Sequence, residues 1–206
     1  DFGNRLHIGI FGKTNSGKSS FINTFSGQKV SIVADVAGTT TDPVYKPMEI
    51  YPLGPCILID TAGFDDEGEL GALRIEKTSL AAQKTELAII LFCEDEMVQE
   101  LKWYNYFKKR QTPVIPVLGK ADLYTQEQKE YLIQMIQKNT GETVCPVSSE
   151  TGEGIRKLKE LLADMTLEEK VNQMSQVVGA FFNKDMDITA MGPMADKGFT
   201  PENVAL

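Results

Sequence analysis

A glycine-rich octet near the start of the chain has the residue types that hold a polyphosphate. Lys18 offers a compact positive charge to the β- and γ-phosphates, and the Ser19 hydroxyl is a hard oxygen ligand suited to Mg²⁺. Glycines let the backbone curl so that successive N–H groups point at phosphate oxygens. The octet is Gly12-Lys13-Thr14-Asn15-Ser16-Gly17-Lys18-Ser19, which fits GxxxxGKS. We therefore expect a triphosphate site lined by Asn15, Ser16, Gly17, Lys18, Ser19 and Ser20.

Two further segments have groups that could complete the metal and γ-phosphate site. One is the run Asp60-Thr61-Ala62-Gly63, which follows an apolar stretch. Asp60 could reach Mg²⁺ through a water molecule, and Gly63 could donate its backbone N–H to the γ-phosphate. In the upstream run A-G-T-T-T-D-P a threonine could bind Mg²⁺; three consecutive threonines leave the register open, and we choose Thr40. For Asp60 alone, a solvated turn residue is the alternative.

Two later segments have residues that could bind a guanine base. Gly119-Lys120-Ala121-Asp122 stands where N-K-x-D would be the usual guanine motif. The oxygens of Asp122 can accept from guanine N1–H and the 2-amino group, which adenine does not offer in that pattern, and the Lys120 stem can lie along the base. Glycine at 119 lacks the asparagine side chain that would bridge base and phosphate loop, which should weaken the pocket. In the second loop, with Ser148 and Ser149, the backbone N–H of Ser149 could meet guanine O6. Each loop alone could be an ordinary β–α turn.

Hydrolysis of bound GTP would need positive charge beside the phosphates. Phe64, directly after the glycine of the D-T-A-G run, cannot orient a water molecule as a glutamine could, and Arg74 is more simply a solvated helix residue. The side-chain carbonyl oxygen of Asn15 could instead help hold K⁺, whose charge would replace that of an arginine. A turn residue with local hydrogen bonds is the alternative for Asn15. We assign catalysis to Lys18, Asn15, Thr40 and Gly63.

These loops need a parallel sheet to bring them together. Apolar runs alternate with segments of helical periodicity. The expected strands are Leu6–Phe11, Val44–Tyr51, Cys56–Ile59, Leu87–Cys93, Pro113–Leu118 and Thr143–Val147. The expected helices are Lys18–Ser26, Leu70–Lys84, Val98–Lys109, Gln126–Lys138 and Ile155–Leu162. We predict an α/β P-loop NTPase fold, a Ras-like G domain whose six-stranded, mostly parallel sheet has helices on both faces. The octet then lies between a strand and a helix, which argues against a chance glycine-rich turn.

The last part of the chain breaks this alternation, so we divide the chain into a GTP-binding domain, residues 1–163, and a C-terminal helix and tail, residues 164–206. Thr166 and Glu169 could form a capping box that begins a separate helix. Apolar residues follow with a/d spacing for two heptads, up to an interruption at Gly179. Packing back onto the domain is the simpler interpretation, and a homodimer seam is the alternative.

Composition narrows the class of partner. The formal net charge is −8, which argues against nucleic acid or a membrane surface as a general partner because both are negative. Without a run of about 18 apolar residues, no membrane span is expected, and we predict a cytoplasmic protein. The three cysteines are far apart and form no CxxC pair, and the single histidine, His7, lies in a predicted strand. We interpret the cysteines and the histidine as structural residues.

The motifs together resemble the TrmE–Era branch of P-loop GTPases. That branch combines an asparagine in the phosphate loop, a G-T-T loop and a hydrophobic residue after D-x-x-G, here Asn15, Gly38–Thr40 and Phe64. Within the branch, the runs Ser31–Ile50 and Gly63–Gly71, continuing to Lys77, resemble the HydF family of FeFe-hydrogenase maturation factors. The resemblance extends over about Leu6 to Leu162.

This resemblance implies a GTPase that uses GTP/GDP, Mg²⁺ and K⁺ and regulates iron–sulfur or di-iron cluster transfer. It also implies other hydrogenase maturation proteins as partners, and a cluster-binding domain that is missing from this chain. The cluster domain of that family carries histidine and a CxxC pair, which this chain lacks, so the chain corresponds at most to the GTPase part. The glycine at 119 is a second departure from the family pattern.

Two other functions are compatible with the same motifs. One is a GTPase of the Era or TrmE kind that acts on the ribosome or in tRNA modification, against which the acidic charge argues. The other is a nucleotide-binding module with little turnover. Gly119, which lacks the usual asparagine side chain, and Phe64, which cannot orient a water molecule, would be compatible with it. RNA binding and potassium-stimulated turnover are the measurements that separate the three.

Overall fold

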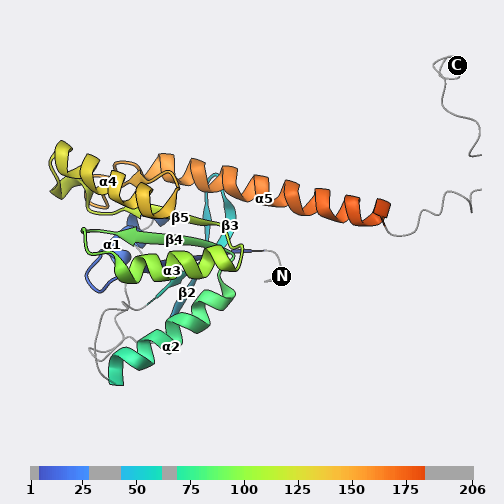
Figure 1. The fold of residues 1–206 in the computed structure, drawn as a ribbon, viewed down its shortest axis with the longest axis horizontal. Helices are drawn as coiled ribbons and strands as arrows, with labels where there is room; N and C mark the ends of the chain where they lie inside the picture. Colours follow the sequence, from blue (N-terminus) through green and yellow to red (C-terminus); the bar gives the residue numbers. More distant parts are fainter. Residues whose placement is uncertain (1–4, 28–42, 62–68, 184–206) are drawn as a thin grey trace, which may run out of the picture. The chain divides into compact units, whose positions relative to one another are not determined.

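A computed structural model describes residues 5–27, 43–61 and 69–183. Within these residues the α/β prediction is confirmed: strands and helices alternate, and the six strands form one sheet in the order β2-β3-β1-β4-β5-β6 (Figure 1). The strands are β1 Leu6–Gly12, β2 Val44–Ile50, β3 Gly54–Asp60, β4 Leu87–Phe92, β5 Val114–Leu118 and β6 Cys145–Pro146. The helices are α1 Lys18–Ser26, α2 Glu69–Lys84, α3 Val98–Lys109, α4 Gln126–Thr140 and α5 Ile155–Asn183, with a short 3₁₀ turn at Ala121–Leu123.

The sheet is mostly parallel, as expected. Strand β1 pairs in parallel with β3 on one side and β4 on the other, and β5 and β6 continue the parallel pairing. Only β2 is antiparallel, paired with β3 at the edge. Pro47 is tolerated in β2 because an edge strand can leave one side of its backbone unpaired.

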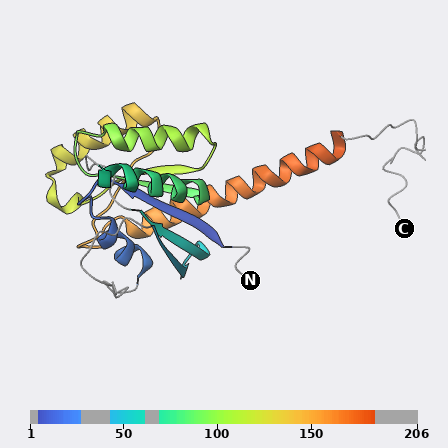
Figure 2. The same ribbon diagram turned by 90° about the horizontal axis from the view of Figure 1, so that it is seen from below.

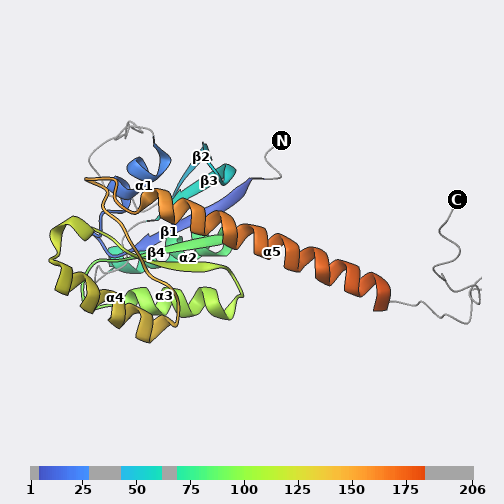
Figure 3. The same cartoon turned by 90° about the horizontal axis from the view of Figure 1, so that it is seen from above.

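Apolar clusters on the two faces of the sheet explain the placement of the helices. One cluster joins Phe21, Ile22 and Phe25 of α1 with Leu158 and Leu162 of α5, over strand residues of β1, β3, β4 and β5. The other joins α2, α3 and α4 with the opposite side of the central strands, through Ala82, Tyr104, Phe107, Leu132 and Ile136. Both faces are therefore covered, as the unbroken apolar sequence of β4 predicts. The two sides can be followed in Figure 2 and Figure 3.

The parallel pairing places the predicted site loops at one edge of the sheet. Ile10 lies opposite Asp60 across the β1–β3 pair, and Gly12 lies opposite Leu91 across the β1–β4 pair. The carboxyl ends of β1, β3, β4, β5 and β6 thus meet, and ligands of open α/β sheets bind at that edge.

Helix α5 corrects one expectation. It runs without interruption from Ile155 to Asn183, whereas the sequence predicted an end near Leu162 and a new helix capped by Thr166. The Thr166 hydroxyl instead donates to the Ala163 carbonyl, 2.8 Å away, within the helix. The chain separates into two compact units, Asp1–Thr166 and Leu167–Leu206; the role of the second unit and the division at residue 163 remain predictions. None of the described helices is long and apolar enough to cross a membrane.

Candidate functional site

The loop between β1 and α1 is curled around its own centre. Asn15 and Gly17 both have a left-handed backbone, with φ values of 60° and 87°, and Gly17 is the N-terminal capping residue of α1. Between them, the Ser16 N–H donates to the Lys13 carbonyl across 3.2 Å. Glycine adopts such a φ without strain, and asparagine does so more readily than most residues. The curl places the N-terminal end of α1 at the loop, as an anion site requires.

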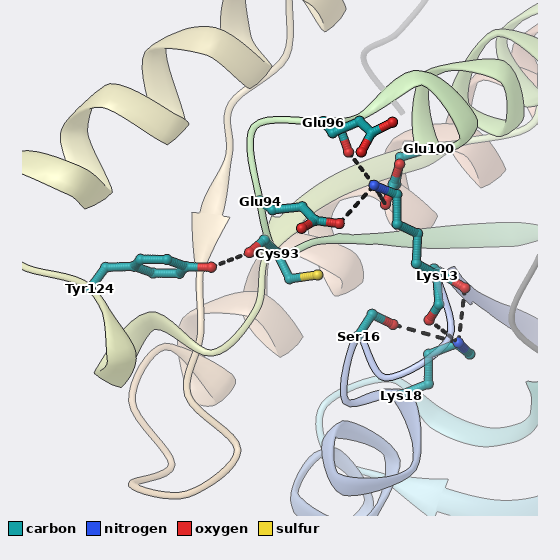
Figure 4. Close-up of polar contacts among 9 residues, drawn as sticks. Lys13, Ser16, Lys18, Cys93, Glu94, Glu96, Glu100 and Tyr124 are labelled. Atoms are coloured by element: carbon teal, nitrogen blue, oxygen red, sulfur yellow. Dashed lines mark hydrogen bonds and ion pairs between the residues drawn. The ribbon is translucent and has the colours of Figure 1, made fainter. Parts of the chain in front are cut away.

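Lys18 points back into this curl. Its Nζ donates to the carbonyl oxygens of Gly12 at 2.8 Å and Lys13 at 2.6 Å, and lies 3.5 Å from the Ser16 hydroxyl (Figure 4). Only 8% of Lys18 is exposed. The ammonium is therefore held at the centre of the loop, where phosphate oxygens could replace the carbonyls as its acceptors.

Close packing explains one glycine of the octet. A Cβ atom at Gly12 would lie 2.7 Å from the Ser16 hydroxyl oxygen and 3.2 Å from the Leu91 carbonyl oxygen. The first distance is shorter than real Cβ contacts and the second is tighter than most, so any larger residue at position 12 would force the Ser16 side chain and the end of β4 to shift.

The end of β3 supplies the acidic group of the predicted metal site. Thr61 fixes this strand end to β1, since its hydroxyl donates to the Ile10 carbonyl across 2.6 Å. Burial raises the pKa of Asp60, while the nearby charges of Lys46 and Lys18 act to lower it. The Lys46 Nζ lies 3.7 Å from a carboxylate oxygen of Asp60. Ser19, the other predicted ligand, lies in the first turn of α1 and is exposed.

This donor set fits Mg²⁺. A hydroxyl and a carboxylate are hard oxygen ligands, and Mg²⁺ is usually bound by one or two such protein groups together with water and substrate phosphates. No group of three or more histidine, cysteine or acidic side chains that could hold a metal occurs among the described residues. Asp60 and Ser19 would therefore hold the ion jointly with a nucleotide rather than in a cage of protein ligands.

Three loops enclose a cavity of about 180 Å³ beside the phosphate loop. The cavity lies between the start of α1 and the segments that follow β5 and β6, which are the loops from which the sequence predicted a base site. Its lining includes Ser16, Gly17, Ser20, Phe21, Gly119, Lys120, Asp122, Leu123, Val147, Ser149 and Glu150. Asp122, from the 3₁₀ turn, is exposed within this wall, so its carboxylate is accessible to a ligand.

Lys120 ties the base loop to the phosphate loop. Its Nζ donates to the Asn15 carbonyl across 2.6 Å, and its own backbone is left-handed, with φ 54°. A Cβ built at Gly17 would lie 3.6 Å from the Cε of Lys120, so the lysine stem passes over the start of α1. Lys120 therefore lines the cavity, and its contact with a base remains a prediction.

Steric crowding does not require a glycine at position 119. A Cβ at Gly119 would make only ordinary contacts, the nearest at 3.7 Å from the Ser16 carbonyl oxygen. Its N–H donates to the Phe92 carbonyl across 2.8 Å, which fixes the end of β5 beside β4. The fold would therefore accept an asparagine Cβ at this position.

The two predicted serines in the loop after β6 have different surroundings. Ser148 is fully buried, and its hydroxyl accepts from the Thr151 N–H across 3.1 Å; it supports the loop from behind the cavity wall. Ser149 lines the cavity, and its carbonyl accepts from the Thr24 hydroxyl of α1 across 2.8 Å. Of the two predicted serines, Ser149 is therefore the one that borders the cavity.

Two predicted site residues, Thr40 and Gly63, lie outside the described residues, as does Phe64. Asn15 is exposed at the tip of the phosphate loop. Its left-handed backbone, with φ 60°, is a structural reason for an asparagine at this position.

Sequence reasoning missed one group of charges beside the phosphate loop. The Lys13 Nζ donates to a carboxylate oxygen of Glu94 across 2.8 Å, and Glu100 is buried nearby (Figure 4). The signal available in the sequence was a lysine inside the octet and a run of acids directly after an apolar strand, at Glu94-Asp95-Glu96.

Comparison with known proteins agrees with this geometry. Residues 7–120 match the family described as 50S ribosome-binding GTPase. The chain is 35% identical over 164 residues to GTPase Der of Wolinella succinogenes, which covers 75% of this chain and 34% of that protein. It is also 35% identical over 153 residues to tRNA modification GTPase MnmE of Aliarcobacter butzleri, covering 69% and 33%. The chain spans about a third of the length of these curated relatives.

Solved structures show the same fold. Era of Aquifex aeolicus bound to GDP.AlF4⁻ superposes with a TM-score of 0.65 at 26% identity, covering 77% of this chain and 56% of that one. Era in complex with MgGDPNP and a segment of 16S ribosomal RNA gives the same score, identity and coverage. These likenesses support the TrmE, Era and Der type in general and do not single out hydrogenase maturation.

Proposed function

The chain belongs to the 50S ribosome-binding GTPase family and is a GTP-binding GTPase domain of the TrmE, Era and Der type, and on this basis we propose that it acts as a nucleotide-dependent switch for a larger assembly. The observation that carries the proposal is the cavity that borders both the curled phosphate loop and the Asp122 turn. A switch of this class changes its contacts when the γ-phosphate leaves.

We assign roles to the residues that surround this site. Lys18 would bind the β- and γ-phosphates, and Ser19 and Asp60, the latter through water, would hold Mg²⁺, which neutralises charge on the phosphate oxygens. Asp122 would accept from guanine N1–H and the 2-amino group, and the Ser149 N–H would meet O6. Thr40 and Gly63 keep their proposed contacts with Mg²⁺ and the γ-phosphate.

For the task of the switch, we propose first a role linked to RNA. The support comes from the relatives: one is named a tRNA modification GTPase, and an Era structure holds 16S ribosomal RNA. Our expectation of no nucleic-acid partner finds no support in these relatives. The net charge of −8 favours contact through a few positioned groups or a further domain over a broad basic surface.

The second candidate is a role in FeFe-hydrogenase maturation, with the other maturation proteins as partners. Its support is the resemblance of Ser31–Ile50 and Gly63–Lys77 to that family of GTPases. On this proposal the nucleotide state would regulate transfer of an iron–sulfur or di-iron precursor held by a separate domain.

RNA binding separates the two tasks. If the RNA-linked proposal holds, labelled 16S ribosomal RNA or tRNA should bind the GTP-bound chain at about 50 mM salt, and less so at about 200 mM, because phosphate contacts release counterions. Fluorescence anisotropy measures both, with the GDP-bound chain as control. An anisotropy that stays flat in both nucleotide states would reject the RNA task and leave hydrogenase maturation, to be tested by co-purification with the maturation proteins.

Potassium should speed hydrolysis through Asn15. Replacing K⁺ by Na⁺ is expected to slow GTP turnover at least about tenfold in the parent, since a positive charge beside the transferring phosphoryl group strongly lowers the barrier. In Asn15→Ala the two salts should give nearly equal rates. Phosphate release measures the rates, and Asn139→Ala, an exposed asparagine on α4, is the control that should behave like the parent. A parent equally fast in both salts would remove the cation from the mechanism.

A further inference from the structure

Lys13, the second residue of the octet, faces away from the nucleotide site. Its Nζ donates to a carboxylate oxygen of Glu94 at 2.8 Å and to the carbonyl of Glu96, and it lies 4.0 Å from a carboxylate oxygen of Glu100. Only 8% of Lys13 is exposed. Figure 4 shows its side chain pointing toward these acids, while Lys18 points into the curl of the loop.

The acids around Lys13 keep it charged in spite of its burial. Burial alone would lower the pKa of Lys13, but the hydrogen bond to Glu94 and the charges of Glu100, Glu94 and Glu96 hold that pKa above its ordinary value. Glu100, near the start of α3, is 1% exposed. A buried carboxylate is costly unless a cation and hydrogen bonds compensate it, so Lys13 and Glu100 depend on each other.

The same residue also supports the phosphate site through its main chain. The Lys13 carbonyl accepts from the Nζ of Lys18 at 2.6 Å and from the Ser16 N–H at 3.2 Å. The side chain of Lys13 therefore fixes the position of a carbonyl on which the phosphate-binding lysine rests.

The acidic segment is itself held in place on its other side. The Tyr124 hydroxyl, next to the base loop, donates to the Cys93 carbonyl (Figure 4). Since the Gly119 N–H also donates to the Phe92 carbonyl, the end of β4 is bonded to the base loop by two contacts. Lys13 thus anchors the phosphate loop to a segment that the base loop already holds.

We propose that Lys13 is a positioning residue for GTP binding: its ion pairs with Glu94 and Glu100 hold the phosphate loop in its curled form before the nucleotide arrives. This inference rests on the proposed nucleotide site and adds a residue to it. Ordering a loop on binding costs free energy, and a preformed loop avoids that cost. Loss of the Lys13 ion pairs should therefore weaken nucleotide affinity and leave the rate of the chemical step almost unchanged.

The test compares Lys13→Met with the parent. Titration with a fluorescent GDP should give an affinity lower by about tenfold, and the KM for GTP should rise by a similar factor, while kcat changes less than about twofold. Lys13→Arg, which keeps the charge, should restore most of the affinity. Glu142→Gln, which removes an ion pair with Lys108 far along the sequence from the loop, should change neither constant.

A second variant separates positioning from stability. Lys13→Met leaves Glu100 buried without its cation and should lower the Tm; Lys13→Met combined with Glu100→Leu should recover Tm but not nucleotide affinity. Parental affinity in that double variant, or a kcat that falls as much as KM rises, would overturn the proposal. A parent that binds no guanine nucleotide would instead reject the proposed function, so the two failures can be told apart.

Discussion

Lys18→Ala should reduce binding of GTP and GDP by at least about a hundredfold. The ammonium is buried in the loop and makes two short hydrogen bonds to carbonyl oxygens, at 2.6 and 2.8 Å, which phosphate oxygens would replace on binding. Hydrogen bonds to a charged group contribute about 1.5–3 kcal/mol each, so losing two of them on the bound phosphates weakens affinity by about two orders of magnitude or more. Isothermal titration calorimetry with GDP and a non-hydrolysable GTP analogue measures the loss.

The control for this variant is Lys157→Ala, which removes an exposed lysine from α5 and should bind as the parent does. Circular dichroism should show that Lys18→Ala is folded, since the loop's remaining backbone bond from Ser16 to Lys13 does not involve the lysine side chain. A folded Lys18→Ala protein with parental affinity would refute the assignment of the phosphate site.

Asp122→Asn should exchange guanine preference for xanthine preference. The carboxylate can accept two hydrogen bonds from guanine, whereas an amide presents one acceptor and one donor, and the donor faces the 2-amino group. Xanthine carries an oxygen in place of that amino group and would accept from the amide. We expect GTP affinity to fall by about a hundredfold and xanthosine triphosphate to bind more tightly than GTP, because an unmatched polar group in a pocket is strongly rejected.

Competition against a fluorescent nucleotide measures this preference. Asp95→Asn, an exposed carboxylate outside the cavity lining, is the matched control and should keep the preference for GTP. An Asp122→Asn protein that still prefers GTP would refute the assignment of Asp122 as the residue that recognises guanine.

Much of the fold could be predicted because its signals are local. Helices α1 and α3 begin and end at the predicted residues, since each is bounded by a change in backbone preference close to its own sequence. The predicted end of the last helix was wrong, and the reason is also local. A threonine followed three residues later by a glutamate is typical of a helix start, yet Thr166 satisfies its hydroxyl on a carbonyl three residues back and remains inside α5.

Strand β6 is shorter than predicted, Cys145–Pro146 instead of Thr143–Val147. Pro146 has no backbone N–H to continue a ladder, and the strand lies at the edge of the sheet, where one neighbour is missing. The periodicity of apolar residues shows where a strand is buried but says little about how many of its backbone groups are paired.

In the candidate site, too, local features could be predicted from the sequence and long-range contacts could not. The octet and the Asp122 turn could be read from the sequence because each is a short motif whose geometry is set by its own residues. The Lys13 anchor could not, since its partners lie 81 residues or more away and come close only because β4 lies beside β1. The lysine in the octet and the acids after the apolar strand are visible in the sequence, but the sequence does not show that they pair with each other.

The glycine at 119 has a consequence for how long the nucleotide stays. A Cβ atom at position 119 would make only ordinary contacts, yet the residue is glycine, so it provides no side chain to bridge the base and the phosphate loop. With that bridge absent, we expect GDP to have a short residence time once hydrolysis is complete. The domain would then reload from solution without a dedicated exchange factor, and its fraction in the active state would follow the ratio of GTP to GDP around it.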